Sequence, residues 1–232
     1  MKQTIIYMAT LFALTVCFSC VNELDNYDAP NGGVYGTVVD RETGQPVPLP
    51  VQGSTGIIIR LMEQGTSATQ TVDFYAKHDG TFENGMVFNC DYLITVDGPF
   101  AEKGEVRATV KGQTKVDIPV LPYARIDATA SVSGKVVTVN YKVQPTGNAY
   151  TVSGVYGYWN FAPGVDNGTA NQAGKVTVTE TEGTIVFDLT DDATYNSNLY
   201  KIRANQNKIY VRIGASTEGF INYSQTITLT VQ

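Results

Sequence analysis

Short runs in which apolar residues occupy every second position recur along most of the chain. Tyr92, Ile94 and Val96 share one set of alternate positions, and four apolar residues do the same within residues 137–143. Side chains of an extended strand point alternately to its two faces, so these runs predict strands with one face in a core. No window shows the sustained 3.6-residue period of an amphipathic helix, and residues 191–203 are the best candidate for one short helix.

Turn signals separate the runs. Many of the 22 glycines follow a small polar or acidic residue, as in Asp79-Gly80 and Glu218-Gly219. Glycine adopts positive φ without a steric penalty, which tight hairpins require. The strands predicted for the first half of the chain cover residues 34–40, 56–62, 69–77, 91–97, 105–110 and 114–120. Those predicted for the second half cover residues 125–132, 135–143, 150–161, 174–180, 183–190, 208–215 and 221–231.

Six or seven short strands in each half predict an all-β protein of two consecutive small β-sandwiches. Two prolines within residues 119–122 interrupt strand pairing and mark the seam. The predicted domains are therefore residues 32–121 and 122–232. One large barrel is the alternative architecture.

The N-terminus has the features of an export signal. Lys2 precedes an apolar stretch that ends in Ser19-Cys20, an arrangement that resembles the cleavage site of bacterial lipoproteins. We expect residues 1–19 to be removed as a lipoprotein signal peptide and Cys20 to be lipidated. Residues 20–31 then form a tether, and the lipid anchor attaches the protein to a membrane. Ordinary secretion with cleavage elsewhere is the alternative.

Composition excludes several functions. The 232 residues contain 16 basic and 22 acidic side chains, for a net charge of −6, whereas nucleic-acid binders carry a basic surface. Processing leaves Cys90 as the one unmodified cysteine, so no intramolecular disulfide is expected. The single histidine, His78, has no partners at metal-binding spacing, and we expect no metal or other cofactor. No catalytic motif is present, and we expect no enzymatic activity.

An aromatic segment followed by a polar loop is the strongest candidate for a binding site. Sugars present apolar C–H faces that stack on aromatic rings, and their hydroxyl groups pair with amides and carboxylates. The candidate glycan-binding residues are Tyr156, Tyr158, Trp159, Asn160, Asp166 and Asn167. Alternation places Tyr156 and Tyr158 on one strand face and Trp159 on the other. Trp159 is then an alternative candidate for the core between the sheets, which leaves the two tyrosines as an exposed platform.

Two sequence motifs resemble those of a known family. Residues 36–47 read GTVVDRETGQPV, which resembles the opening strand and turn of carboxypeptidase regulatory-like, transthyretin-like domains. The DGTF sequence at 79–82, followed by the strand that begins at Tyr92, fits the same pattern. With DNYDAP at 25–30, the chain resembles the two-domain Bacteroidetes lipoproteins of domain-of-unknown-function family 3823.

The resemblance implies a transthyretin-like first domain, and we expect the second sandwich to be immunoglobulin-like or fibronectin-like. The resemblance also implies a glycan-uptake locus, with SusC-like and SusD-like proteins as partners, and it supplies no catalytic residues. We therefore expect a lipid-anchored outer-membrane protein facing the cell exterior, which binds glycan or assists polysaccharide uptake. The alternative is a structural or protein-docking subunit, or an adhesin, that binds no glycan.

Overall fold

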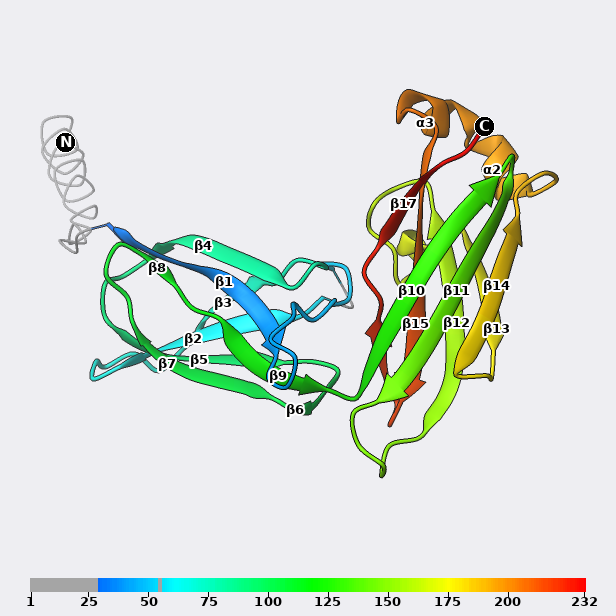
Figure 1. Ribbon diagram of the computed structural model, residues 1–232. Coiled ribbons are helices and arrows are strands. Elements are labelled where there is room, and N and C mark those ends of the chain that lie inside the picture. The colour runs from blue at the N-terminus through cyan, green and yellow to red at the C-terminus, as the bar shows by residue number, and fades with distance from the viewer. Residues whose placement is uncertain (1–28, 54–55) are drawn as a thin grey trace, which may run out of the picture. The chain divides into compact units, whose positions relative to one another are not determined.

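The computed structural model describes residues 29–53 and 56–232, and residues 31–232 form one compact unit (Figure 1). The predicted signal peptide, the predicted lipidation site Cys20 and most of the predicted tether lie outside the described residues. No helix in the described part of the chain is long and apolar enough to cross a membrane.

Two β-domains follow one another along the chain, and a short linker at Tyr123 joins them (Figure 1). The strands of the first domain are β1 (Gly32–Asp40), β2 (Ile58–Gln64), β3 (Val72–Tyr75), β4 (Thr81–Val87), β5 (Asp91–Asp97), β6 (Phe100–Glu102), β7 (Gly104–Thr109), β8 (Gln113–Lys115) and β9 (Ile118–Pro122). The second contains β10 (Ala124–Ser133), β11 (Val136–Pro145), β12 (Val152–Asn160), β13 (Gly174–Val178), β14 (Glu182–Asp188), β15 (Lys208–Thr217), β16 (Phe220–Tyr223) and β17 (Ile227–Thr230). Its helices are the 3₁₀-helix η1 (Thr169–Asn171), α2 (Ala193–Ser197) and α3 (Leu199–Ala204).

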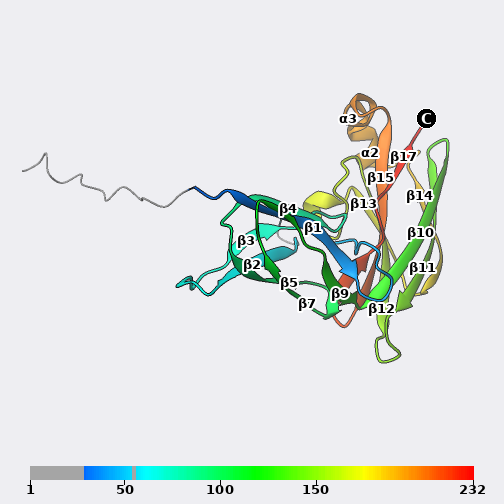
Figure 2. The same ribbon diagram turned by 60° about the vertical axis from the view of Figure 1, so that its left-hand side comes forward.

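Each domain is a sandwich of two sheets. In the first, a sheet with the order β4-β1-β9-β6, to which β8 also pairs through β1, faces a sheet with the order β3-β2-β5-β7. In the second, β10-β11-β14 faces β13-β12-β15-β16, and β17 also pairs with β15 (Figure 2). The all-β class and the two consecutive sandwiches are therefore confirmed, and the single barrel is excluded.

The first core lies where alternation predicted it. Tyr92, Ile94 and Val96 of β5 are all buried, and they pack with Val34 of β1 and Ile59 of β2. The turn at Asp79-Gly80 also forms as predicted, because Gly80 has φ +90° and the Asp79 carboxylate accepts from the Thr81 amide. The buried residues of the two sheets belong to one hydrophobic cluster, so the two sheets share a single core.

The second core receives its apolar residues from facing strands and from the two short helices. Val137 and Val139 of β11 pack in the same cluster as Trp159 of β12. The predicted helical segment forms α2 and α3, which contribute Tyr195 and Ile202 to this cluster. Asp192 caps α2, since its carboxylate accepts from the Tyr195 amide at 2.7 Å.

Some strand predictions were wrong. Strands β4 and β6 were missed, and the predicted strand 69–77 shortens to β3. The predicted strand 221–231 divides into β16 and β17, both of which pair with β15. The chain leaves the sheet at Ser224 between them, where the Ser224 carbonyl accepts from the Arg212 side chain at 2.7 Å. This side-chain contact lies at the break between the two strands, and local alternation does not reveal it.

Candidate functional site

Trp159 belongs to the core and cannot stack on a sugar. Its side chain is 1% exposed, and its ring lies 6.3 Å from that of Tyr195. Across the β12–β13 ladder it pairs with Gly174, where a Cβ atom would lie 2.2 Å from the indole nitrogen. Glycine is therefore required at position 174. The prediction of Trp159 as a glycan contact was wrong, and its alternative place between the sheets is correct.

Tyr158 is also buried, although it lies on the opposite face of β12. It is fully inaccessible and packs with Val165 and Tyr223, because residues 161–173 fold across this outer face of the sheet. Burial raises the pKa of its phenol, and the hydroxyl has no hydrogen-bond partner among the described residues. Tyr156 is half-buried, with the Lys175 ammonium 4.3 Å from its ring centroid. The predicted exposed tyrosine platform is therefore wrong.

Asn160 and Asp166 hold the loop that covers this face. Asn160 is 4% exposed; its side chain accepts from the Phe161 amide and donates to the Gly164 carbonyl. Asp166 is fully buried, and one of its oxygens accepts from the Gly168 amide and the Asn171 side chain, both at 2.8 Å. These two predicted glycan contacts are therefore structural. Of the polar candidates, only Asn167 stays exposed.

Asp166 also joins the two domains, as does Asn222. The second carboxylate oxygen of Asp166 accepts from the Val51 amide of the first domain at 2.8 Å. Asn222 of β16 donates to the Pro99 carbonyl of the first domain at 2.8 Å, and within the second domain it accepts from the Ala124 amide. The outer face of the sheet that contains β12 is thus where the first domain docks.

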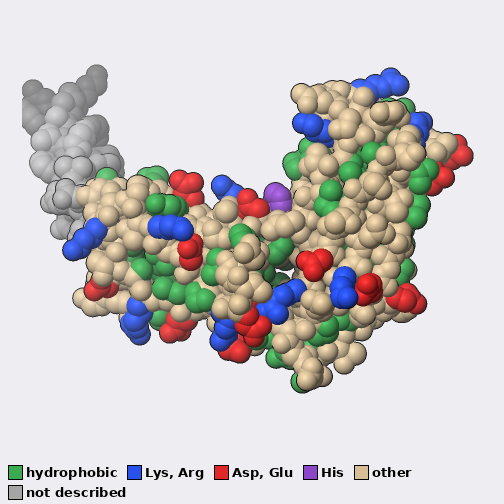
Figure 3. Space-filling view, viewed as in Figure 1, with side chains coloured by type: hydrophobic (Ala, Val, Ile, Leu, Met, Phe, Trp, Pro, Cys, Tyr) green, Lys and Arg blue, Asp and Glu red, His purple; other side chains and the backbone are tan. Residues whose placement is uncertain are grey.

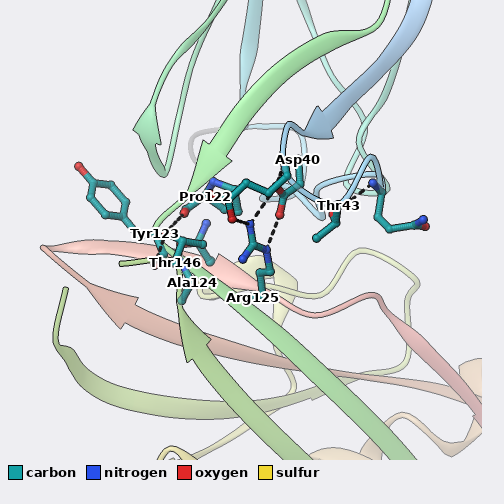
Figure 4. Close-up of polar contacts among 10 residues, drawn as sticks. Asp40, Thr43, Pro122, Tyr123, Ala124, Arg125 and Thr146 are labelled. Carbon is teal, nitrogen blue, oxygen red and sulfur yellow. Dashed lines mark hydrogen bonds and ion pairs between the residues drawn. The ribbon is translucent and has the colours of Figure 1, made fainter. Parts of the chain in front are cut away.

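A second group of contacts fixes the linker. The Arg125 guanidinium points at the Asp40 carboxylate, with Nη2–Oδ1 at 3.0 Å (Figure 4). It also pairs with Glu42 at 2.7 Å. Burial alone would raise the pKa of Asp40, but the hydrogen bonds from Arg125 and from the Glu42 amide outweigh it and lower that pKa. The Thr146 hydroxyl donates to the Pro122 carbonyl at 2.6 Å, which fastens the linker to the second domain.

The best candidate site is a groove of about 530 Å³ at the domain junction. We call it the junction groove. Residues of both domains line it: Pro50, Ile57, Asp97, Gly98, Pro99, Lys103, Asn167, Gly219, Phe220, Ile221 and Tyr223. Its volume lies within the range of about 300–1,000 Å³ that is typical of ligand pockets. On the molecular face shown in Figure 3, acidic and basic side chains are interspersed.

Phe220 gives the junction groove an aromatic wall. Its side chain is 46% exposed, and its ring stacks on Tyr123 with centroids 5.4 Å apart and an angle of 10° between the planes. Tyr150 packs edge-on against Tyr123 at 5.2 Å, so the ring of Phe220 is supported from behind. Glu218 and Gly219 have φ of +52° and +80°, which forms the tight turn that presents Phe220 at the start of β16.

Polar groups line the rest of the groove. Asp97 carries an ion pair with Lys103 at 2.7 Å, and both side chains are more than half exposed. The Tyr223 hydroxyl donates to Asn167 Oδ1 at 2.8 Å. Asn167 was among the binding residues predicted from the sequence, whereas Phe220 was missed. The one local signal for Phe220 was its position as an aromatic residue directly after the Glu218-Gly219 turn. A second hollow of about 300 Å³, beside Asp40 and Arg125, has no exposed aromatic wall.

Comparison with known proteins identifies the family. The model of the N-terminal domain of a protein of unknown function, DUF3823, matches residues 33–121. The model of the DUF3823 C-terminal domain, also of unknown function, matches residues 123–227. The chain belongs to the DUF3823 family. The resemblance inferred from the sequence motifs is therefore confirmed.

Solved structures of DUF3823 proteins share the two-domain fold. A family member from Parabacteroides merdae is 21% identical, with a TM-score of 0.72 over 88% of this chain and 100% of its own. One from Bacteroides ovatus is 19% identical, with a TM-score of 0.71 over 86% and 99%. A Bacteroides uniformis protein with a provisional carbohydrate-binding assignment is 21% identical, with a TM-score of 0.65 over 87% and 100%. No curated protein matches the chain.

Two further side chains of this DUF3823 protein that the sequence singles out are His78 and Cys90. Among residues 29–53 and 56–232, no group of three or more His, Cys, Asp or Glu side chains is placed to hold a metal ion. Burial and the nearby Arg212 charge lower the pKa of His78, which disfavours the protonated imidazole. Cys90 is a free, partly buried thiol that packs against the first core.

Proposed function

We propose that this protein is a non-catalytic glycan-binding component of a polysaccharide-uptake system. In this proposal, Cys20 is lipidated and holds the protein at the outer membrane, facing the cell exterior, beside SusC-like and SusD-like partners. The observation that carries the proposal is the junction groove, where an exposed and supported aromatic ring faces amide, hydroxyl and charged groups. The carbohydrate-binding assignment of the Bacteroides uniformis relative supports the same class of ligand.

The groove has the two properties that sugar recognition requires. The ring of Phe220 offers a flat apolar surface for the C–H face of a sugar, and its stack on Tyr123 fixes that surface before a ligand arrives. The Oδ1 atom of Asn167 already accepts from Tyr223, which leaves its Nδ2 group to donate to a sugar hydroxyl. The Asp97 carboxylate can accept from another hydroxyl.

Affinity electrophoresis of residues 21–232, which contain the whole compact unit, tests this function against a panel of plant, host and microbial polysaccharides. We expect at least one glycan to retard the protein and Phe220→Ala to weaken that retardation about tenfold, a loss of about 1.4 kcal/mol. Tyr200→Ala is the matched control, because Tyr200 is a 68% exposed aromatic residue of α3 outside the groove. Equal losses in both variants would place the binding site elsewhere.

The same incubations test the absence of catalysis. Glycans that retard the protein should release no new reducing ends on prolonged incubation. Release of reducing ends by wild type, and not by a boiled sample, would overturn the non-catalytic part of the proposal.

A protein-docking role is the second candidate, favoured by exposed apolar side chains on the first domain. Tyr35, Met86 and Phe88 lie on or directly after the neighbouring strands β1 and β4 and are 41%, 72% and 44% exposed. Large exposed apolar side chains on neighbouring strands are compatible with a protein interaction site. The docking role is favoured if no glycan on the panel retards the protein and if Met86→Asp abolishes its co-purification with the SusC-like and SusD-like proteins.

A further inference from the structure

A buried arginine stands at the centre of the domain junction. Arg212, in the middle of β15, is fully inaccessible to solvent. Its guanidinium donates to the carbonyls of Ser224 at 2.7 Å, Val165 at 3.1 Å and His78 at 3.2 Å. These acceptors belong to three segments: the residue directly after β16, the loop 161–173 and a turn of the first domain. Arg212 therefore connects both domains and the loop that covers β12.

Only an arginine side chain can make this set of bonds. A guanidinium carries five N–H donors in a rigid plane, so it can bond carbonyls that lie in different directions, whereas a lysine ammonium is a compact point charge. The guanidinium carbon also lies 4.6 Å from the Tyr223 ring centroid, on the aromatic face that favours a cation. Burial lowers the pKa of Arg212 to about 10, so the group remains charged at pH 7.

The groups that join the domains are sequence neighbours of the groups that line the groove. Asp166, which accepts from Val51 of the first domain, precedes the groove residue Asn167. Asn222, which donates to Pro99 of the first domain, lies between the groove residues Ile221 and Tyr223. Tyr223 itself contacts Arg212 and donates to Asn167. The geometry of the groove therefore depends on the docking of the two domains.

We propose that Arg212 is a positioning residue that locks the two domains together and thereby shapes the junction groove. This locking of the domains, which we call the lock, rests only on the contacts of Arg212 with Ser224, Val165 and His78. Its consequence for ligands rests on the proposed function: a glycan that contacts both walls of the groove stabilises the docked state, and loss of the lock weakens glycan binding by the same linkage.

Hydrogen exchange of residues 21–232 without glycan tests the lock. The Val51 amide reports on docking, because it donates across the junction to Asp166. In Arg212→Lys we expect this amide to exchange at least tenfold faster, while the amides of β5 and β11 keep their wild-type rates. Arg107→Lys is the control, because Arg107 lies on β7 and bonds Gln64 within the first domain. An unchanged Val51 rate in Arg212→Lys would overturn the lock.

If Arg212→Lys also exposes β5 and β11, the variant is unfolded and wild-type protein decides the question. In low urea, the Val51 amide, which donates across the junction, should then open before either core opens. Opening of the Val51 amide only together with the two cores would contradict a junction that opens separately.

The effect of the Arg212 contacts on glycan binding is measured separately. A glycan that retards wild type should slow exchange at Val51, and Arg212→Lys should weaken its retardation at least tenfold with Phe220 intact. Full retardation of a variant with an open junction would overturn the link between lock and groove. If no glycan binds wild type, the proposed function fails, while the exchange measurement still decides the lock.

Discussion

Strands β11 and β12 occupy the same domain, yet they face different surroundings. In β11, Val137, Val139, Tyr141 and Val143 are buried, and the residues between them face outward. In β12, both Tyr158 and Trp159 are buried, although they lie on opposite faces. One face of β12 packs in the core, and the other is covered by the loop 161–173 and lies at the docking face of the first domain.

The outer face of an alternating strand can therefore contact either water or another part of the protein. A polar outer face indicates contact with water, as at Asn140 and Lys142 of β11. An aromatic outer face, as at Tyr156 and Tyr158, is equally compatible with a ligand and with another part of the same chain. Three substitutions test these surroundings: one on each face of β12 and one at the linker between the domains.

The largest effect is expected on the inner face of β12. Trp159→Ala removes a core side chain that is 1% exposed, and should lower the free energy of unfolding by about 3–5 kcal/mol. Urea denaturation measures this loss. Val186→Ala is the control on an outward-facing position, 50% exposed, and should cost less than about 0.5 kcal/mol. A cost below about 1 kcal/mol for Trp159→Ala would contradict its place in the core.

The second-largest effect is expected at the linker, where the contribution of Asp40 to stability depends on pH. Asp40→Asn keeps the shape of the side chain but removes the charge that pairs with Arg125, and should cost about 1.5–3 kcal/mol at pH 7. Because folding lowers the pKa of Asp40, its contribution is complete above the unfolded-state pKa of about 3.9. The contribution is lost as the pH falls through the folded-state pKa.

Urea midpoints of wild type and Asp40→Asn should therefore converge as the pH is lowered from 7 to 2. Asp127→Asn controls for a nearby carboxylate, since no salt bridge or hydrogen bond of its side chain occurs within the described part of the chain. A constant difference between wild type and Asp40→Asn across the pH range would show that the charge of Asp40 does not stabilise the linker.

The smallest effect is expected on the outer face of β12. Tyr158→Phe removes a buried hydroxyl that has no hydrogen-bond partner among the described residues. The variant should be as stable as wild type or more stable by up to about 1 kcal/mol, because no hydrogen bond is lost. Thermal unfolding measures the change. A loss above about 1 kcal/mol would mean that the hydroxyl bonds to a group such as a buried water molecule.

The fold was largely predictable because its signals are local. Alternation located β5 and β11, turn pairs located hairpins such as that at Asp79-Gly80, and Asp192 stands before the short helices. Strand β4 was missed, because the residues 83–86 in its middle are polar or small apart from Met86 and show no alternation. The candidate site was less predictable, because it consists of residues that are distant in the sequence.

The amino-acid sequence by itself determined the all-β class, the two domains and the family, since strand period, turn chemistry and family motifs are all properties of neighbouring residues. Only the tertiary structure decided which aromatic rings are exposed. Exposure depends on what covers a face, and the cover of Tyr158 comes from a loop and from the domain junction. The same junction places Phe220 beside Asp97 and Lys103, more than one hundred residues away, and so creates the groove.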